Sequence, residues 1–190
     1  MKKNTEKIEL NPGTLLIATS ELDNTEFART VILIVTREKG TMGVVMNQRN
    51  FIPSTVNELI PELKDTPEVP LYSGGILEKD ILFVLHSFKE IQDGLPLGDG
   101  MFMNGDFDQI QQYLAEGREM NGKARFFIGY AGWGPLQLEE EIKEGCWIVS
   151  KCDRKLLLES DPDSIWTIAL KRMGEPYSLY TQIPRDILPS

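Results

Sequence analysis

Residues 129–142, which read GYAGWGPLQLEEEI, decide the fold of this chain most directly. An apolar run at residues 125–130 leads into this stretch, and its three glycines allow a sharp turn that larger residues would obstruct. Gly134 is an acceptable N-cap, and Pro135 suits the first position of a helix. The carboxylates that follow suit the positive end of a helix dipole, and Gly145 suits the helix end. We therefore predict a strand, a glycine turn and a helix.

Apolar runs elsewhere predict further short strands, and capped amphipathic segments predict helices. The strands are expected at residues 14–19, 30–36, 43–47, 69–72, 81–86, 125–130 and 146–149. Short capped helices are expected after Thr55, after Asp106 and from Asp161 to Gly174. Regular alternation of strand and helix is missing, so the pattern predicts an α+β fold with a mixed or largely antiparallel sheet. We expect one domain over residues 1–190, with a flexible segment at residues 1–10.

The composition is that of a globular protein with an acidic balance. The 190 residues include 41% hydrophobic and 26% charged residues, enough for one substantial core. With 29 acidic and 20 basic side chains, the net charge is −9, which disfavours direct binding to nucleic acid phosphates. No apolar run approaches the roughly 18–20 residues that span a bilayer, and the N-terminal residues lack a secretory pattern. We expect a cytoplasmic protein that does not bind membranes.

Several motifs fail as catalytic, cofactor or metal sites. Residues 117–124 (GREMNGKA) nearly match a P-loop, but Ala124 lacks the hydroxyl that Mg²⁺ needs, and the segment follows a helix instead of preceding one. His86 is the only histidine and ends an apolar strand, so a structural role is favoured over a general base. Cys146 and Cys152 fit no zinc or redox spacing and are expected to be free thiols, with a regulatory thiol left open. We predict no catalytic residue, cofactor or metal site.

Four sequence blocks resemble one bacterial family. They are PGTLLIA with FARTVI (residues 12–18 and 27–32), GVVMN (residues 43–47), YSGG leading to LH (residues 72–75 and 85–86), and the stretch from Gly129 through Trp147. On these blocks the chain is similar to the YqgE/AlgH family, and the resemblance covers nearly its whole length. It departs from the family pattern at Ile76, at Gln48-Arg49 and at Leu136, where the family usually has a proline, an Arg-Pro pair and a glycine.

The resemblance implies a compact α+β fold of coiled sheets that form a barrel-like core. From the sequence pattern we expect about three helices in it. The family has no established biochemical activity, and its frequent label as a transcriptional regulator implies DNA binding or an indirect regulatory role. The acidic composition favours the indirect role. The first hypothesis is therefore a non-enzymatic regulatory or interaction protein with an unknown protein or small-molecule partner.

Two alternatives remain open. The second hypothesis is a small-molecule-binding protein, or an enzyme with an unrecognised site around Trp133, and the third is direct DNA binding. For the second, polar and aromatic groups near strand ends are expected to share one cleft, where an arginine pairs with an anion and a tryptophan stacks on a ring. These candidates are Arg29, Asn47, His86, Tyr130, Trp133, Gln137 and Glu141. Each also has a structural role available.

Overall fold

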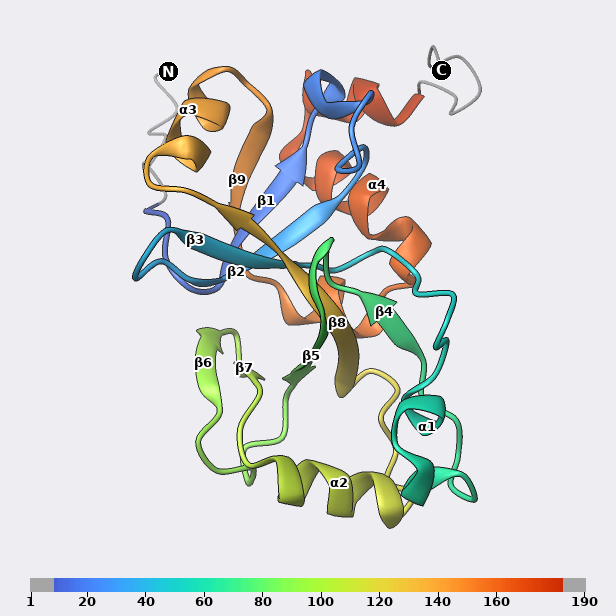
Figure 1. Ribbon diagram of the computed structural model, residues 1–190. Coiled ribbons are helices and arrows are strands. Elements are labelled where there is room, and N and C mark those ends of the chain that lie inside the picture. The colour runs from blue at the N-terminus through green and yellow to red at the C-terminus, as the bar shows by residue number, and fades with distance from the viewer. Residues whose placement is uncertain (1–8, 183–190) are drawn as a thin grey trace.

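The computed structural model describes residues 9–182, which form one nine-stranded sheet with helices around it (Figure 1). The strands lie in the order β6-β7-β5-β8-β3-β2-β1-β9, and β4 pairs with β8 beside this path. Their bounds are β1 Thr14–Ala18, β2 Val31–Thr36, β3 Thr41–Val45, β4 Leu71–Ser73, β5 Leu77–His86, β6 Leu95–Gly98, β7 Met101–Met103, β8 Ala124–Trp133 and β9 Trp147–Lys151.

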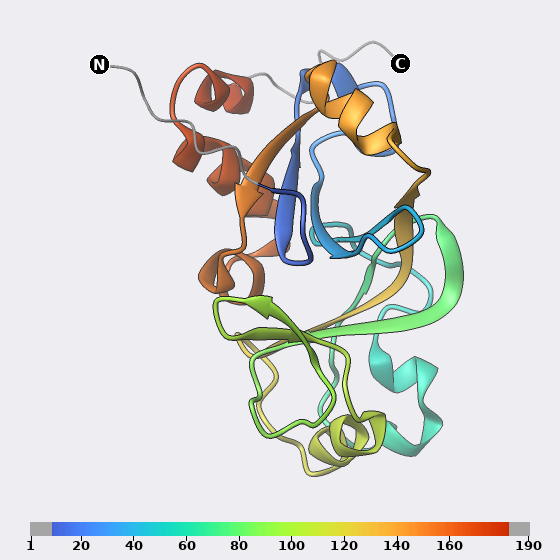
Figure 2. The same cartoon turned by 90° about the vertical axis from the view of Figure 1, so that its left-hand side faces the viewer.

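The sheet is mixed and curls into a half-barrel (Figure 2). Strand β4 runs parallel to β8, and the other pairings are antiparallel. The long strand β8 pairs with β3 near its C-terminal end and with β5 nearer its N-terminal end, so it joins the two parts of the sheet. The predicted α+β class with a coiled, barrel-like core is confirmed. A single domain over the whole chain stays a prediction, and residues 1–8 of the segment predicted to be flexible lie outside the described residues.

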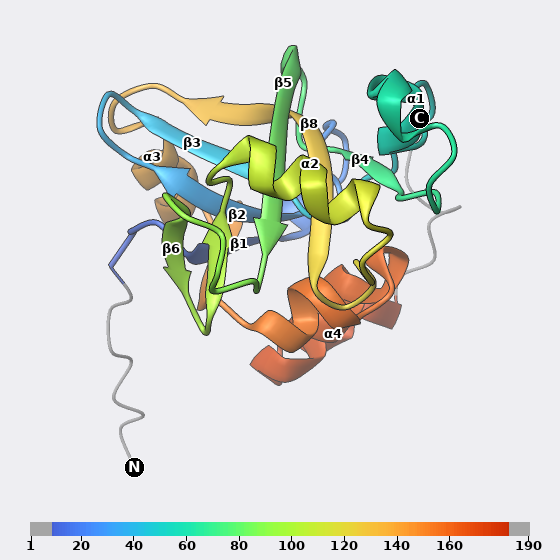
Figure 3. The same ribbon diagram turned by 90° about the horizontal axis from the view of Figure 1, so that it is seen from below.

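Four α-helices occur in residues 9–182, where about three were expected: α1 (Val56–Leu59), α2 (Phe107–Ala115), α3 (Gln137–Lys143) and α4 (Pro162–Met173). Three of them begin at the predicted caps. The side chains of Thr55, Asp106 and Asp161 each accept a hydrogen bond from a backbone N–H in the first turn of their helix. Figure 3 shows α2 and α4 at separate places on the sheet.

Three groups of buried apolar side chains fill the space between sheet and helices. One group packs against α4 and includes Phe127 and Trp166. A second lies beneath α2 and includes Phe126 and Leu114. The third packs against α3 and includes Trp133. Neighbouring residues of β8 thus serve different clusters, as alternating strand side chains do.

Several details differ from the sequence expectation. The hairpin of β6 and β7 was missed, because its apolar residues are few and interrupted by Pro96 and Gly98. A turn of π-helix at Lys155–Glu159 was also missed. The predicted start of α3 is wrong: the helix begins at Gln137, and Leu136, not Gly134, is its N-cap. Leu136 has φ of +66°, a left-handed conformation that favours glycine.

We expect the substitution Leu136→Gly to raise the free energy of unfolding by about 0.5–1 kcal/mol. An L-residue in the left-handed region costs about 1–2 kcal/mol, of which part is offset by the larger backbone entropy that glycine loses on folding. The Leu136 side chain is 69% exposed, so little packing is lost. Urea denaturation followed by circular dichroism measures the change. Leu136→Ala is the control, since it shortens the side chain but keeps the strained Cβ, and equal stabilisation by both variants would contradict the strain argument.

Candidate ligand-binding site

Three of the predicted site residues form a hydrogen-bonded cluster at the end of β8. The Glu141 carboxylate accepts hydrogen bonds from the Trp133 Nε1 at 2.8 Å, the Trp147 Nε1 at 2.7 Å and the Gln137 Nε2 at 3.0 Å. Phe27 stacks on the Trp133 ring with centroids 6.3 Å apart. Trp133 is only 5% exposed. These contacts give Trp133, Gln137 and Glu141 structural partners: the carboxylate joins two buried indoles to α3.

Arg29 and Asn47 lie next to each other at a different place. The Asn47 Oδ1 accepts a hydrogen bond from the Val31 N–H at 2.9 Å, and its Nδ2 donates to the Arg29 carbonyl at 2.9 Å. Arg29 has φ of +56°, and its guanidinium carbon lies 5.2 Å from the centre of the Trp166 ring. Asn47 therefore holds the strained backbone at Arg29. Both residues line an open depression of about 660 Å³ together with Arg49.

His86 and Tyr130 are placed apart from both groups. The His86 side chain is fully buried; its Nε2 lies 2.7 Å from the Asn104 carbonyl, and its Nδ1 accepts the Phe88 N–H at 3.2 Å. Burial lowers the pKa of His86, so the ring is neutral at physiological pH. Tyr130 packs edge-on against Phe83 and the core. The seven candidates are thus distributed over separate environments, and contact of any of them with a ligand stays a prediction.

Both cysteines are free thiols. Burial raises the pKa of Cys146, and nearby acidic groups act in the same direction. Burial, with Asp99 and Asp153, raises the pKa of Cys152 to about 12. Both thiols are therefore protonated at neutral pH, which disfavours the thiolate that redox sensing or nucleophilic attack requires.

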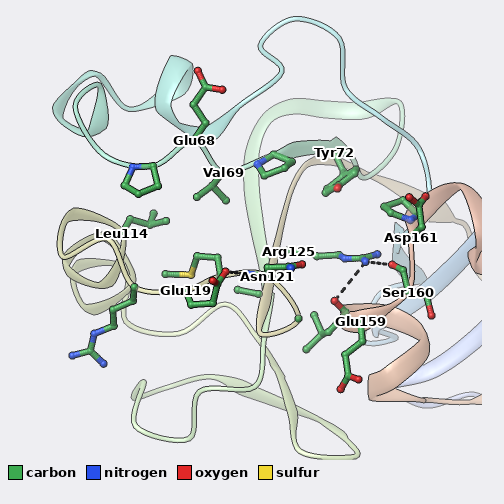
Figure 4. Close-up of a pocket in the computed structure, with 18 of the residues that line it drawn as sticks. Glu68, Val69, Tyr72, Leu114, Glu119, Asn121, Arg125, Glu159, Ser160 and Asp161 are labelled. Atoms are coloured by element: carbon green, nitrogen blue, oxygen red, sulfur yellow. Dashed lines mark hydrogen bonds between the residues drawn. The ribbon is translucent and has the colours of Figure 1, made fainter.

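A separate candidate site is a cavity of about 570 Å³ at the other end of β8 (Figure 4). Three segments far apart in the sequence build it: residues 67–72 before and within β4, the turn at residues 117–122 after α2, and residues 158–162 before α4. Ala124 and Arg125, the first residues of β8, line it as well. Parallel pairing of β4 with β8 sets Tyr72 near Arg125.

Arg125 supplies a buried positive charge and hydrogen-bond donors at the wall of this cavity. Its side chain is 9% exposed, and its guanidinium lies beside Ser160 and Asp161 (Figure 4). The Nη2 donates to the Ser160 carbonyl, with the Leu158 carbonyl at 3.5 Å, and the guanidinium carbon lies 5.9 Å from the centre of the Tyr72 ring. The Nη1 is buried and has no hydrogen-bond partner among residues 9–182. Burial lowers the pKa of Arg125, although the group stays protonated at neutral pH.

Carboxylates also line this cavity. The lining includes four acidic residues, Glu68, Glu119, Glu159 and Asp161, against the two arginines Arg118 and Arg125. Glu159 is paired with Arg154 at 3.4 Å. Arg118 is paired with Glu116 at 2.7 Å and stacks on Tyr113, with its guanidinium carbon 3.6 Å from the ring centre. The rim is therefore acidic while the wall holds a buried donor.

Part of this cavity is the near P-loop motif, for which the sequence predicts no function. The near P-loop at residues 117–124 runs from helix to strand, as expected, and supplies the turn that lines the cavity. Arg125 stands directly after it in an otherwise apolar strand, and a charged residue among buried neighbours was the available signal. Within the described part of the chain, no His, Cys, Asp and Glu side chains are grouped so that they could hold a metal ion. No helix among residues 9–182 is long and apolar enough to cross a membrane.

We expect Glu141→Ala to lower the free energy of unfolding by about 3 kcal/mol, because two buried indole N–H groups lose a charged acceptor. Urea denaturation followed by circular dichroism measures this change. Tryptophan fluorescence is not a suitable probe, because the substitution removes a group that contacts both indole rings. The matched control is Glu140→Ala, an exposed neighbour on the same helix, which is expected to change stability by less than about 0.5 kcal/mol. Equal stability of the two variants would show that the carboxylate is not needed structurally and would favour a ligand role for the cluster.

Comparison with known proteins gives the family of this chain. A sequence model described as AlgH-like matches residues 15–178. The chain is 39% identical to a UPF0301 protein of Bacteroides fragilis over 174 residues, which is 91% of this chain and 88% of that protein. A UPF0301 protein of Bacteroides thetaiotaomicron is 37% identical over the same shares of the two chains.

Two solved structures share the fold. Protein DIP2367 from Corynebacterium diphtheriae aligns with a TM-score of 0.74 at 26% identity, over 94% of this chain and 95% of that one. The solution structure of the AlgH protein from Pseudomonas aeruginosa aligns with a TM-score of 0.69 at 29% identity, over 93% of this chain and 98% of that one. With sequence and structure in agreement over most of the chain, this protein belongs to the AlgH-like family.

Proposed function

We propose that this protein is a non-enzymatic interaction protein of the bacterial cytoplasm, and that it acts in regulation by binding a polar ligand or partner segment in the Arg125 cavity. Any effect on transcription is then indirect. The observation that carries the proposal is the buried Nη1 of Arg125, a charged donor that the described residues leave without a partner.

The energetics of Arg125 favour an external acceptor. A buried charged donor that lacks a hydrogen bond costs on the order of 1–3 kcal/mol or more. Two backbone carbonyls accept hydrogen bonds from the Nη2. They do not account for the Nη1. A ligand that supplies an acceptor would recover this cost on binding, which makes Arg125 a natural recognition group.

The residues that line the cavity are better suited to binding a ligand than to catalysing a reaction. The Ser160 hydroxyl donates to the Lys155 carbonyl at 3.3 Å and is not paired with a general base. The Asp161 carboxylate caps α4 by accepting the Asp163 N–H at 2.9 Å. The volume of about 570 Å³ lies within the range of pockets that hold small ligands. These groups offer hydrogen bonds and shape, and their hydrogen bonds within the chain hold them in place.

The charge distribution argues for an indirect effect on transcription. The whole chain carries a net charge of −9, and four carboxylates against two guanidinium groups line the cavity. Nucleic acid binding requires cations that replace condensed counterions, so such a surface repels a phosphate backbone. A small ligand or protein segment meets no such barrier.

The test is a thermal-shift screen of the purified protein against amino acids, short peptides, organic acids and nucleotides, combined with a quantitative pull-down from cytosolic extract. We expect at least one compound class or one protein to bind in a manner that depends on Arg125. A ligand at 100 times its Kd adds about 2.7 kcal/mol of stability, which raises the Tm by about 5–10 °C for a chain of this size.

Arg125→Met is expected to abolish this binding. Arg125→Lys is expected to weaken it, because an ammonium group cannot donate two parallel hydrogen bonds as the planar guanidinium does. Asn121→Trp places a large side chain in the cavity from an exposed turn residue and should also abolish binding. This second variant is needed because Arg125→Met could lose binding through misfolding alone. Arg172→Met is the matched control at an exposed position outside the cavity lining, and it should keep the binding. If no compound and no extract protein distinguishes wild type from Arg125→Met and Asn121→Trp, the proposed function is wrong.

A further inference from the structure

We propose that the Arg125 cavity recognises a cationic ligand that carries a carboxylate, of the size of a short basic peptide with a free C-terminus. The inference rests on the proposed function and names the ligand class of the same site. The carboxylate binds at the Arg125 wall, and the cationic groups face the acidic rim.

The carboxylate end is assigned from the geometry of Arg125. A guanidinium presents its donors in a planar fork that matches a carboxylate, and charge-assisted hydrogen bonds are about twice as strong as neutral ones. The Nη2 already donates to backbone carbonyls, so the Nη1 is the donor without a partner among residues 9–182. Because the Nη1 is closed off from solvent, the guanidinium has to turn toward the cavity when a ligand binds. The wall beside it includes the aromatic ring of Tyr72, which shields the interaction from water.

The positive groups of the ligand are assigned from the carboxylates at the rim of the cavity. In Figure 4, Glu68 and Glu119 lie on one side of Arg125, and Ser160 and Asp161 lie on the other. Glu68, Glu119 and Asp161 are exposed and form no ion pair among the described residues, whereas Glu159 already has Arg154. A simple anion would meet these carboxylates before it reached Arg125. A ligand with positive groups beside its carboxylate satisfies both charges, because a positive group neutralises the rim while the carboxylate neutralises the wall.

The remaining lining fits the chain of such a ligand. Val69, Leu114, Met120 and Leu158 provide apolar contact, and Pro67, Pro70 and Pro162 make parts of the wall rigid. The cavity of about 570 Å³ has room for more than a carboxylate and one amine. An extended basic segment that ends in a carboxylate matches this combination of buried donor, apolar wall and acidic rim.

Isothermal titration calorimetry with three synthetic tripeptides tests the assignment on the full chain. The probes are Ala-Lys-Arg with a free C-terminus, the same peptide as the C-terminal amide, and Ala-Glu-Glu with a free C-terminus. We expect the basic free acid to bind, the amide to bind at least tenfold more weakly, and the acidic peptide to bind more weakly still. Arg125→Met should remove the difference between the free acid and the amide, whereas Arg172→Met, at an exposed position outside the cavity lining, should preserve it.

A matched pair of triple variants tests the rim. Glu68→Gln, Glu119→Gln and Asp161→Asn together remove the three carboxylates of the lining that form no ion pair among the described residues, and the asparagine can still cap α4. Glu38→Gln, Glu140→Gln and Glu144→Gln change the net charge equally at exposed positions outside the cavity lining. We expect the cavity triple to weaken the basic peptide at least tenfold and the control triple to change it less than threefold at 0.15 M salt, where distant exposed charges are screened.

Each result decides one part of the inference. Equal affinity for the free acid and the amide overturns the assignment of the carboxylate to Arg125. Tighter binding of the acidic peptide, or equal effects of the two triple variants, overturns the assignment of the rim. If neither basic peptide binds while another compound shows Arg125-dependent binding in the thermal-shift screen, the ligand class is wrong and the proposed function stands. If nothing binds in an Arg125-dependent manner, both are wrong.

Discussion

Backbone pairing along β8 is the constraint on which the rest of the structure depends. This one strand pairs with β3, β4 and β5, so it joins the part of the sheet beneath α3 to the part beneath α2. The pairing requires glycine where the strands crowd together: a Cβ on Gly129 would lie 2.7 Å from the Gly75 carbonyl oxygen. Gly129 of the family stretch is therefore explained by strand packing and needs no ligand.

Polar groups are buried at both ends of β8, but they are satisfied to different degrees. At its C-terminal end, two indole N–H groups share the Glu141 carboxylate, so each buried donor has an acceptor within the chain. At its N-terminal end, Arg125 brings a full positive charge into the cavity, and among residues 9–182 its hydrogen bonds go only to backbone carbonyls. A buried polar group with partners stabilises the fold, whereas one with an unused donor costs stability unless something else binds it. The N-terminal end of β8 therefore holds the candidate site.

Local signals in the sequence were sufficient for most of the fold. The caps at Thr55, Asp106 and Asp161 were predicted, because a cap depends on residues within one turn of each other. The α3 cap was misplaced, because the left-handed conformation of Leu136 contradicts the intrinsic preference of leucine. The Arg125 cavity could not be predicted at all. Its walls come from segments around residues 70, 120 and 160, and only the sheet pairing brings them together.

This contrast bears on how function is sought in the family. The stretch that marks the family most clearly, at residues 129–142, is accounted for by a close strand crossing, a strained helix start and a hydrogen-bonded tryptophan pair. A motif that the fold requires identifies relatives but does not specify their ligands. Ligand specificity then has to come from residues whose presence the fold does not explain. In this chain Arg125 is such a residue, since an apolar side chain would suit a buried strand position better and would not leave a charged donor to satisfy.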